Sequence, residues 1–202
     1  MKKILLVVGL LSITGAVSSA GVIFSTDGTA TPGFFPSNGN SNTSSVFHAF
    51  QFTVAAGNGG VLDKLVVAGQ SSTGFTETFE ILSDSSGNPG SLLVTVPVLV
   101  TGDSVSRLYT ASPAASLTLV AGNTYWIEAT SPSGSDTFFW LQANPNFSAT
   151  EFSSASGRFA GQPSSAFALL DAGAVSGVPE PATWLLPLSC FVPLAARRTR
   201  RK

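Results

Sequence analysis

Short apolar runs separated by turn residues constrain this chain more than any other feature of its sequence. Runs of Val, Phe, Leu and Ile alternate with clusters of Gly, Ser, Asn and Pro, and turns at intervals of about 8–12 residues are typical of all-β domains. Within Phe75–Leu82, the residues Phe75, Phe79 and Ile81 share one face, opposite Thr and Glu side chains, as in a strand buried on one side. The pattern predicts an all-β fold, a single β-sandwich or jelly-roll-like domain.

Ten segments fit the strand pattern. We expect strands at Val22–Thr26, Val46–Val54, Val61–Ala68, Phe75–Leu82, Leu92–Val100, Val105–Ala111, Ser116–Val120, Thr124–Thr130, Thr137–Ala143 and Ala166–Asp171. Turns are expected at Gly57–Gly60, Asp84–Gly90 and Ala121–Asn123, where Gly and Asn can adopt positive φ. The polar stretch Pro32–Ser45 is expected to be a mobile loop.

The first twenty residues have the three parts of a secretory signal peptide. Two lysines form the positive start, Ile4–Val17 is mostly apolar, and small residues precede a cleavage site between Ala20 and Gly21. The alternative is a retained membrane anchor. The apolar run is shorter than the ~20 residues that a spanning helix needs, so we expect cleavage.

A second apolar segment, Ala182–Ala196, lies close to the basic end Arg197–Lys202. Its 15 residues would extend about 22 Å as a helix, less than the ~30 Å of a bilayer's hydrocarbon core. Pro187 and Pro193 would each remove a helix hydrogen bond. The basic end would stay on the cytoplasmic side. We expect a transient anchor rather than a permanent transmembrane helix.

The residues before this segment form a short motif. Val178-Pro179-Glu180-Pro181-Ala182, with the apolar run and the Arg-rich end behind it, resembles the PEP-CTERM sorting tail of bacterial envelope and matrix proteins. The resemblance implies that Pro179, Glu180 and Pro181 are recognised by an exosortase, a membrane protease that processes the chain near them. It also implies export through the inner membrane to the cell surface or extracellular matrix. Such tails are sometimes labelled after ice-binding proteins, but the regularly spaced Thr repeats of an ice-binding face are absent from this sequence.

Four segments of the body resemble the choice-of-anchor R domain, an extracellular bacterial β-sandwich that precedes several kinds of sorting tail. They are Phe50–Thr53, Val61–Val67, Gly87–Leu93 and Leu119–Ile127. The resemblance implies the same fold and no activity. The chain therefore divides into a signal peptide (1–20), a β-sandwich domain (21–177) and a sorting tail (178–202).

The charge of the chain is divided unevenly. Seven of its ten basic residues lie in the two ends, so the body has three cations against ten carboxylates, a net charge near −7. Nucleic acid is an unsuitable partner for such a surface, because phosphate binding needs clustered cations. The only cysteine, Cys190, lies in the apolar tail segment, so the body has no internal disulfide. We expect a small apolar residue there, with a lipidation site as the alternative.

The ionisable residues of the body do not form a recognised catalytic motif. His48 is the only histidine and no Gly-x-Ser-x-Gly elbow is present, so a packed histidine is expected rather than a catalytic triad. Too few His and Cys residues are present for a zinc site. Glu77 and Glu80 fall on opposite faces of one strand, so they are not expected to act as a glycosidase pair.

Two polar or aromatic groups remain as candidate sites. Asp84, with Ser85 and Asn88, could supply oxygen ligands for calcium, although a turn needs the same residues and is the preferred interpretation. Trp126 and Trp140, together with Tyr109 and Tyr125, could form a platform for sugar stacking, although aromatic residues of a sandwich lie mainly in the core and that is the preferred interpretation. Because Tyr125 and Trp126 face opposite sides of a strand, we expect one in the core and one exposed.

The sequence therefore predicts an exported surface or matrix protein without catalytic activity, catalytic residues, metal or cofactor. Its expected partners are an exosortase-type protease and, transiently, the membrane. The alternative is a carbohydrate-binding module that acts on exopolysaccharide, and a secreted hydrolase is the third hypothesis.

Overall fold

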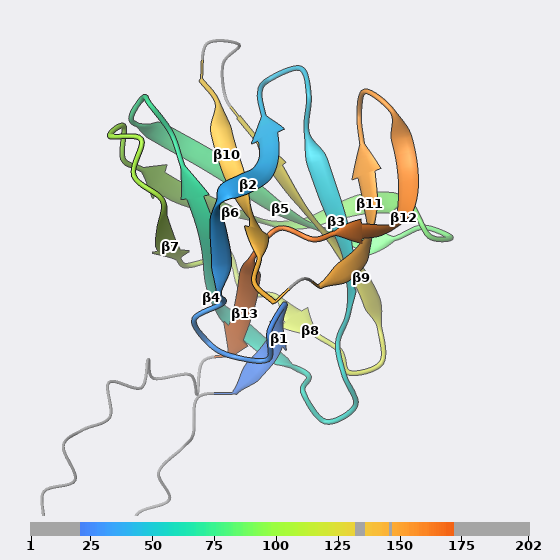
Figure 1. Cartoon of the computed structure of the whole chain (residues 1–202). Helices are drawn as coiled ribbons and strands as arrows, with labels where there is room; N and C mark the ends of the chain where they lie inside the picture. Colours follow the sequence, from blue (N-terminus) through green and yellow to red (C-terminus); the bar gives the residue numbers. More distant parts are fainter. Residues whose placement is uncertain (1–20, 132–135, 146, 172–202) are drawn as a thin grey trace, which may run out of the picture.

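The computed structural model describes residues 21–131, 136–145 and 147–171. These residues form thirteen β-strands in two antiparallel sheets that face each other (Figure 1). The predicted all-β sandwich is confirmed. The predicted signal peptide and the sorting tail, with Pro179, Glu180 and Pro181, lie outside the described residues.

The first sheet has seven strands. Its spatial order is β1 (Val22–Ser25), β13 (Phe167–Asp171), β4 (Gly60–Gln70), β10 (Phe138–Ala143) and β2 (Phe34–Asn42), and β7 (Arg107–Ala111) and β8 (Thr118–Leu119) also pair with β4. Every pair in this sheet is antiparallel. β2 is one edge of the sheet.

The second sheet has six strands. Its order is β12 (Gly157–Pro163), β11 (Ser148–Ser153), β3 (His48–Thr53), β9 (Thr124–Thr130), β5 (Phe75–Asp84) and β6 (Pro89–Val100). All of its pairs are antiparallel. β12 is one edge of this sheet, so the sandwich has an open side between β2 and β12 (Figure 1).

The inner faces of the two sheets form one aromatic-rich core. Phe79 and Ile81 of β5 are fully buried, as their alternation predicts. Trp140 of β10 contacts Phe50 and Phe79 edge-to-face, with ring centroids 5.3 and 5.0 Å apart. Such aromatic pairs add about 0.5–1.5 kcal/mol beyond the burial of their area. This core stabilises the domain, a role that disulfides fill in smaller secreted folds.

The predicted turns are present. Between β5 and β6, Ser85 and Asn88 exchange backbone hydrogen bonds of 2.9 and 3.2 Å. The two residues between them, Ser86 and Gly87, have φ values of 53° and 79°, the backbone of a type I′ hairpin turn. Gly122 of the turn Ala121–Asn123 also has a positive φ, 83°.

Three strands were not expected. The prediction that Pro32–Ser45 is a mobile loop is wrong, because β2 runs through it and pairs with β10. β11 and β12 form a hairpin at the edge of the second sheet. β2 contains three Asn and a Gly, and β12 contains two Gly and a Pro, residues with low β-propensity. None of the three strands has a sustained apolar alternation, so their conformation depends on hydrogen bonds to their neighbouring strands.

The two ends of the domain meet. The backbone N–H of Gly21 donates to Asp171 Oδ1, and the N–H of Asp171 donates to the carbonyl oxygen of Gly21, both at 3.0 Å. A Cβ at Gly21 would collide with the Asp171 carboxylate. The contact closes the domain at one end of the sandwich.

Candidate functional site

Neither Trp126 nor Trp140 offers a ring face to a ligand. Trp140 is 0% exposed inside the core, and its Nε1–H donates to the Ala166 carbonyl oxygen at 3.1 Å. Trp126 is also 0% exposed. Because a sugar can stack only on an accessible ring, the alternative of a stacking platform at Trp126 and Trp140 is wrong, and both side chains are buried as the preferred interpretation requires.

The burial of Trp126 has a cause that the strand pattern does not reveal. It lies on the outer face of the second sheet, where it packs with Ala49, Leu82 and Phe152 in a small second cluster. Tyr125 is buried on the inner face, 7% exposed. The expectation that one of Tyr125 and Trp126 is exposed is therefore wrong, since both faces of β9 are covered.

Asp84 serves the turn and the Trp126 cluster. Its Oδ2 accepts from the Gly87 N–H at 2.9 Å, and its Oδ1 accepts from Trp126 Nε1 at 2.8 Å and Gln51 Nε2 at 2.9 Å. These hydrogen bonds, led by that from Gly87, lower the pKa of Asp84. Both oxygens already have donors, so the geometry favours the turn over the calcium interpretation. Among the residues the structure describes, no group of three or more His, Cys, Asp or Glu is placed to hold a metal ion.

The predicted separation of Glu77 and Glu80 is confirmed. Glu77 is buried on the inner face of β5, whereas Glu80 lies opposite Glu128 of β9 on the outer face. Burial, together with the charge of Glu80, raises the pKa of Glu128 to about 7. The sequence does not reveal this second carboxylate pair, because it depends on the register between β5 and β9.

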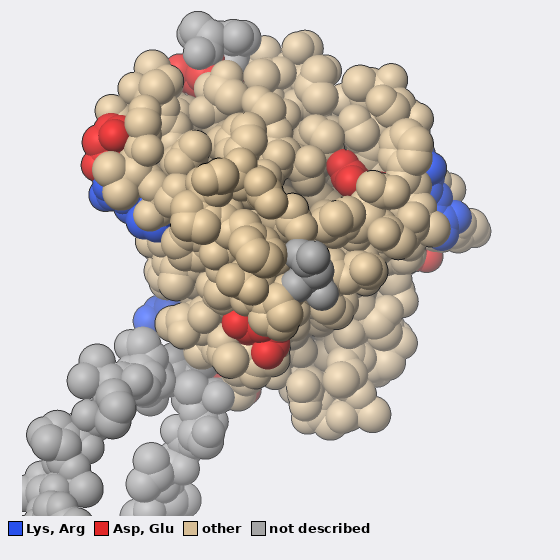
Figure 2. Space-filling model, viewed as in Figure 1, with Lys and Arg blue, Asp and Glu red and all other residues tan. Residues whose placement is uncertain are grey.

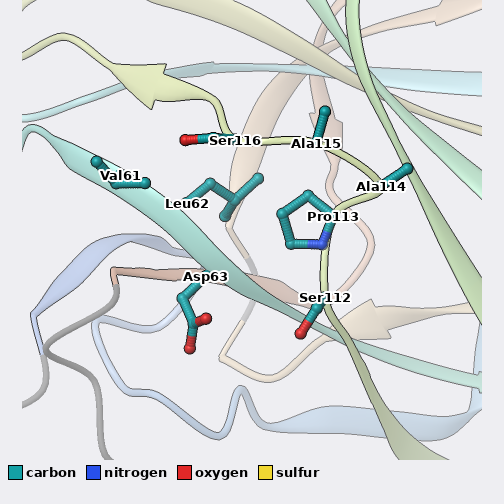
Figure 3. Close-up of a pocket in the computed structure, with 8 residues that line it drawn as sticks. All are labelled: Val61, Leu62, Asp63, Ser112, Pro113, Ala114, Ala115 and Ser116. Atoms are coloured by element: carbon teal, nitrogen blue, oxygen red, sulfur yellow. The ribbon is translucent and has the colours of Figure 1, made fainter.

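One surface hollow of the domain is chemically sparse. It has a volume of about 360 Å³ and lies between the start of β4 and the β7–β8 connection. Its lining residues, drawn in Figure 3, are Val61, Leu62, Asp63, Ser112, Pro113, Ala114, Ala115 and Ser116. Asp63 is the single ionisable side chain in this set, so the hollow has no acid–base pair.

His48 is held by a carboxylate. Its Nδ1 lies 2.5 Å from Glu151 Oε1, and the two side chains are only 16% and 11% exposed. Its backbone N–H donates to Asn42 Oδ1 at 2.9 Å. Ser153, the serine opposite His48 in the sheet register, accepts from the Ala155 N–H within its own turn. The predicted packed histidine is thus present, with Glu151 as its partner.

Polar residues occupy inner positions on the open side of the sandwich. Asn40 and Asn42 lie opposite the core residues Trp140 and Phe138, and Glu151 lies opposite Phe50. Directly paired residues share a face, so these polar side chains point between the sheets. We call the following inward-facing residues the polar cleft: Asn40, Asn42, His48, Gln142, Glu151 and Gln162.

A small pocket opens within the polar cleft. Its volume is about 110 Å³, and its lining residues are Gly39, Asn40, Gln142, Glu151, Gln162 and Pro163. They come from β2 and β10 of one sheet and from β11 and β12 of the other. Figure 2 shows acidic atoms over β3 and β11 on this face, surrounded by uncharged residues. The pocket is therefore a polar site with a single carboxylate.

Sequence reasoning missed most of the polar cleft. Its residues lie mainly on β2, β11 and β12, and none of these strands was expected. Asn, Gln and Glu scattered over such stretches read as solvated loop residues. Only the pairing of the two edges with the core strands brings them together.

Comparisons with known proteins do not assign a function to this chain, so a function has to be argued from the fold and this site. No protein-family model matches the sequence, and no curated protein is significantly similar to it. Within the described part of the chain, no helix is long and apolar enough to cross a membrane. The predicted apolar segment Ala182–Ala196 lies outside that part.

Proposed function

We propose that this chain is an exported surface or extracellular-matrix protein without catalytic activity, sorted through Pro179, Glu180 and Pro181. The observation that carries the proposal is the contact between Gly21 and Asp171, which places both ends of the domain side by side. A leader before Gly21 and a tail after Asp171 therefore leave the sandwich at one end. The other end and the open side stay free to face away from a membrane.

The order of events follows from the two ends. The leader directs export and is removed between Ala20 and Gly21. The apolar segment Ala182–Ala196 then holds the chain in the membrane while Arg197–Lys202 stays on the cytoplasmic side. An exosortase-type protease processes the chain near the Pro-Glu-Pro motif, and the domain is released to the surface or matrix.

The motif is tested by replacing Pro179, Glu180 and Pro181 with alanine in the producing bacterium. The variant should accumulate as a longer, membrane-associated form, because the apolar segment remains while its processing signal is lost. Thr183→Ala, two residues beyond the motif, is the matched control and should be processed normally. Fractionation with mass measurement of the intact chain reports both size and location. Unchanged size and release of the triple variant would refute the sorting proposal.

The ionisable groups of the domain support a role without catalysis. His48 binds Glu151, Asp84 serves a turn, and Glu77 is hydrogen-bonded to Ser131 inside the core. Each of these groups has a structural partner. Incubating the purified chain with chromogenic glycoside and ester substrates tests this part: turnover that is lost in Glu151→Gln would establish a hydrolase instead.

A further inference from the structure

The polar cleft differs from the rest of the sandwich in the residues that occupy its inward-facing positions. Apart from Glu77, the inner positions of the core strands carry mainly Phe, Trp, Leu, Ile and Val, and burying polar groups without partners costs stability. On the open side these positions carry three amides, a carboxylate and a histidine, together with the fully buried Asn42. Local violations of an otherwise consistent pattern mark functional sites in proteins.

The cleft keeps unused hydrogen-bonding groups at its surface. Among the described residues, Asn40 and Gln162 have no hydrogen-bond partner for their side-chain amides, and Glu151 binds His48 through Oε1 alone. Amides both donate and accept, and a carboxylate accepts. His48 fixes the position of Glu151, so a ligand would meet a preorganised acceptor between adaptable amides.

An exposed aromatic ring lies beside these polar groups. Phe159 of β12 is the direct cross-strand neighbour of Glu151, so the two side chains share a face. Phe159 is 41% exposed, in contrast to the buried Trp126 and Trp140. An apolar ring beside a carboxylate and amides suits a ligand with one apolar face and a rim of hydroxyl groups.

The size and charge of the pocket restrict the ligand further. A volume of 110 Å³ is well below the roughly 300–1,000 Å³ of sites that enclose a drug-sized ligand, so the pocket admits the hydroxyl edge of one sugar ring and not a whole oligosaccharide. The carboxylate of Glu151 would repel an anionic sugar, since like charges in close contact are unfavourable. The ligand class is therefore a neutral sugar residue at the end of a glycan.

We infer that the polar cleft binds a terminal neutral saccharide, with Glu151, Asn40 and Gln162 on its hydroxyl groups and Phe159 against its ring. The inference goes beyond the proposed sorting function and does not depend on processing of the tail. A site this small and open should bind weakly, with a Kd of roughly 1 mM for a monosaccharide.

The test is saturation-transfer NMR on the full chain, held in a detergent without a sugar headgroup. The probes are glucose, galactose, mannose, N-acetylglucosamine and glucuronic acid. At least one neutral sugar should bind, and glucuronic acid should bind at least tenfold more weakly than that sugar. Absence of binding by all four neutral sugars at 50 mM, about 50 times the expected Kd, would overturn the inference, as would binding of glucuronic acid as tight as that of the best neutral sugar.

Variants locate the site. Glu151→Gln, Gln162→Ala and Phe159→Ala should each weaken binding by about tenfold. Gln162 and Phe159 are partly exposed, so their variants keep the fold even if Glu151→Gln disturbs His48. Leu99→Ala, at a residue 76% exposed on β6, and Glu80→Gln are the matched controls and should bind normally. Equal binding by all three cleft variants and the wild type would place the sugar elsewhere and refute the assignment.

Discussion

Replacing Glu77 with glutamine tests how the domain accommodates a carboxyl group in its core. Glu77 is 0% exposed, its Oε2 lies 2.7 Å from Ser131 Oγ, and that hydroxyl lies 3.1 Å from the Asn42 carbonyl oxygen. A hydroxyl has one proton, so Ser131 cannot donate to both oxygens when Glu77 is ionised. Protonated Glu77 can donate from Oε2 to Ser131, which then donates to Asn42. The neutral acid therefore fits the site.

The magnitude follows from the pKa. Burial raises the pKa of Glu77 from 4.5 to about 7, with the charge of Asp136 acting in the same direction and the Ser131 hydrogen bond against it. Below pH 4.5 the folded and unfolded states are both protonated and the carboxyl costs nothing. As the pH rises from 4.5 through 7, Glu77 ionises more easily in the unfolded state than in the folded state, so the free energy of unfolding falls. At 1.36 kcal/mol per pKa unit, the loss approaches about 3 kcal/mol above pH 7.

Glutamine imitates the protonated acid at every pH, because its amide can donate to Ser131. Glu77→Gln should therefore match the wild type near pH 4.5 and exceed its stability by up to about 3 kcal/mol at pH 8.5. The assay is urea unfolding at fixed ionic strength across this range. Glu128 titrates in the same interval, so the difference between variant and wild type isolates Glu77. Asp63→Asn is the control and should keep the wild-type loss of stability. A difference that stays constant from pH 4.5 to 8.5 would refute the reasoning.

Two further predictions concern the other carboxylates. Glu128→Gln should stabilise the domain above pH 7, by up to about 3 kcal/mol, because burial and Glu80 raise the pKa of Glu128 to about 7. A double-mutant cycle with Glu80→Gln, measured by urea unfolding, should show coupling between the two residues. Strictly additive effects of the two substitutions would contradict this prediction. Removal of the leader after Ala20 would give Gly21 a free ammonium group 3.0 Å from Asp171 Oδ1. Asp171→Asn should therefore lower the free energy of unfolding by about 1 kcal/mol more in a chain that starts at Gly21 than in a chain that retains Ala20. Thermal unfolding of the two pairs of chains measures this difference.

The polar edges show why part of the site could not be read from the sequence. The strand at Phe75–Leu82 was predictable because one face repeats apolar residues every second position. The stretch Pro32–Ser45 has no such repeat, and β2 forms within it only because β10 offers free backbone groups. Propensity is a weak guide where pairing with a distant strand decides the conformation. Asn40 and Glu151, with Phe159 beside them, could therefore not be assembled in advance.

The sequence by itself determined the fold class, ten of the strands, their turns, the opposite faces of Glu77 and Glu80, and the acidic charge of the body. All of these depend on local spacing or composition, which the chain carries without its fold. Tertiary structure alone decided that Trp126 and Trp140 are buried, that Glu80 faces Glu128, and that His48 meets Glu151 at the open side. These contacts join residues far apart in the chain, so they depend on register and on which sheet faces are covered. A two-residue period specifies which side a residue faces and not what lies there.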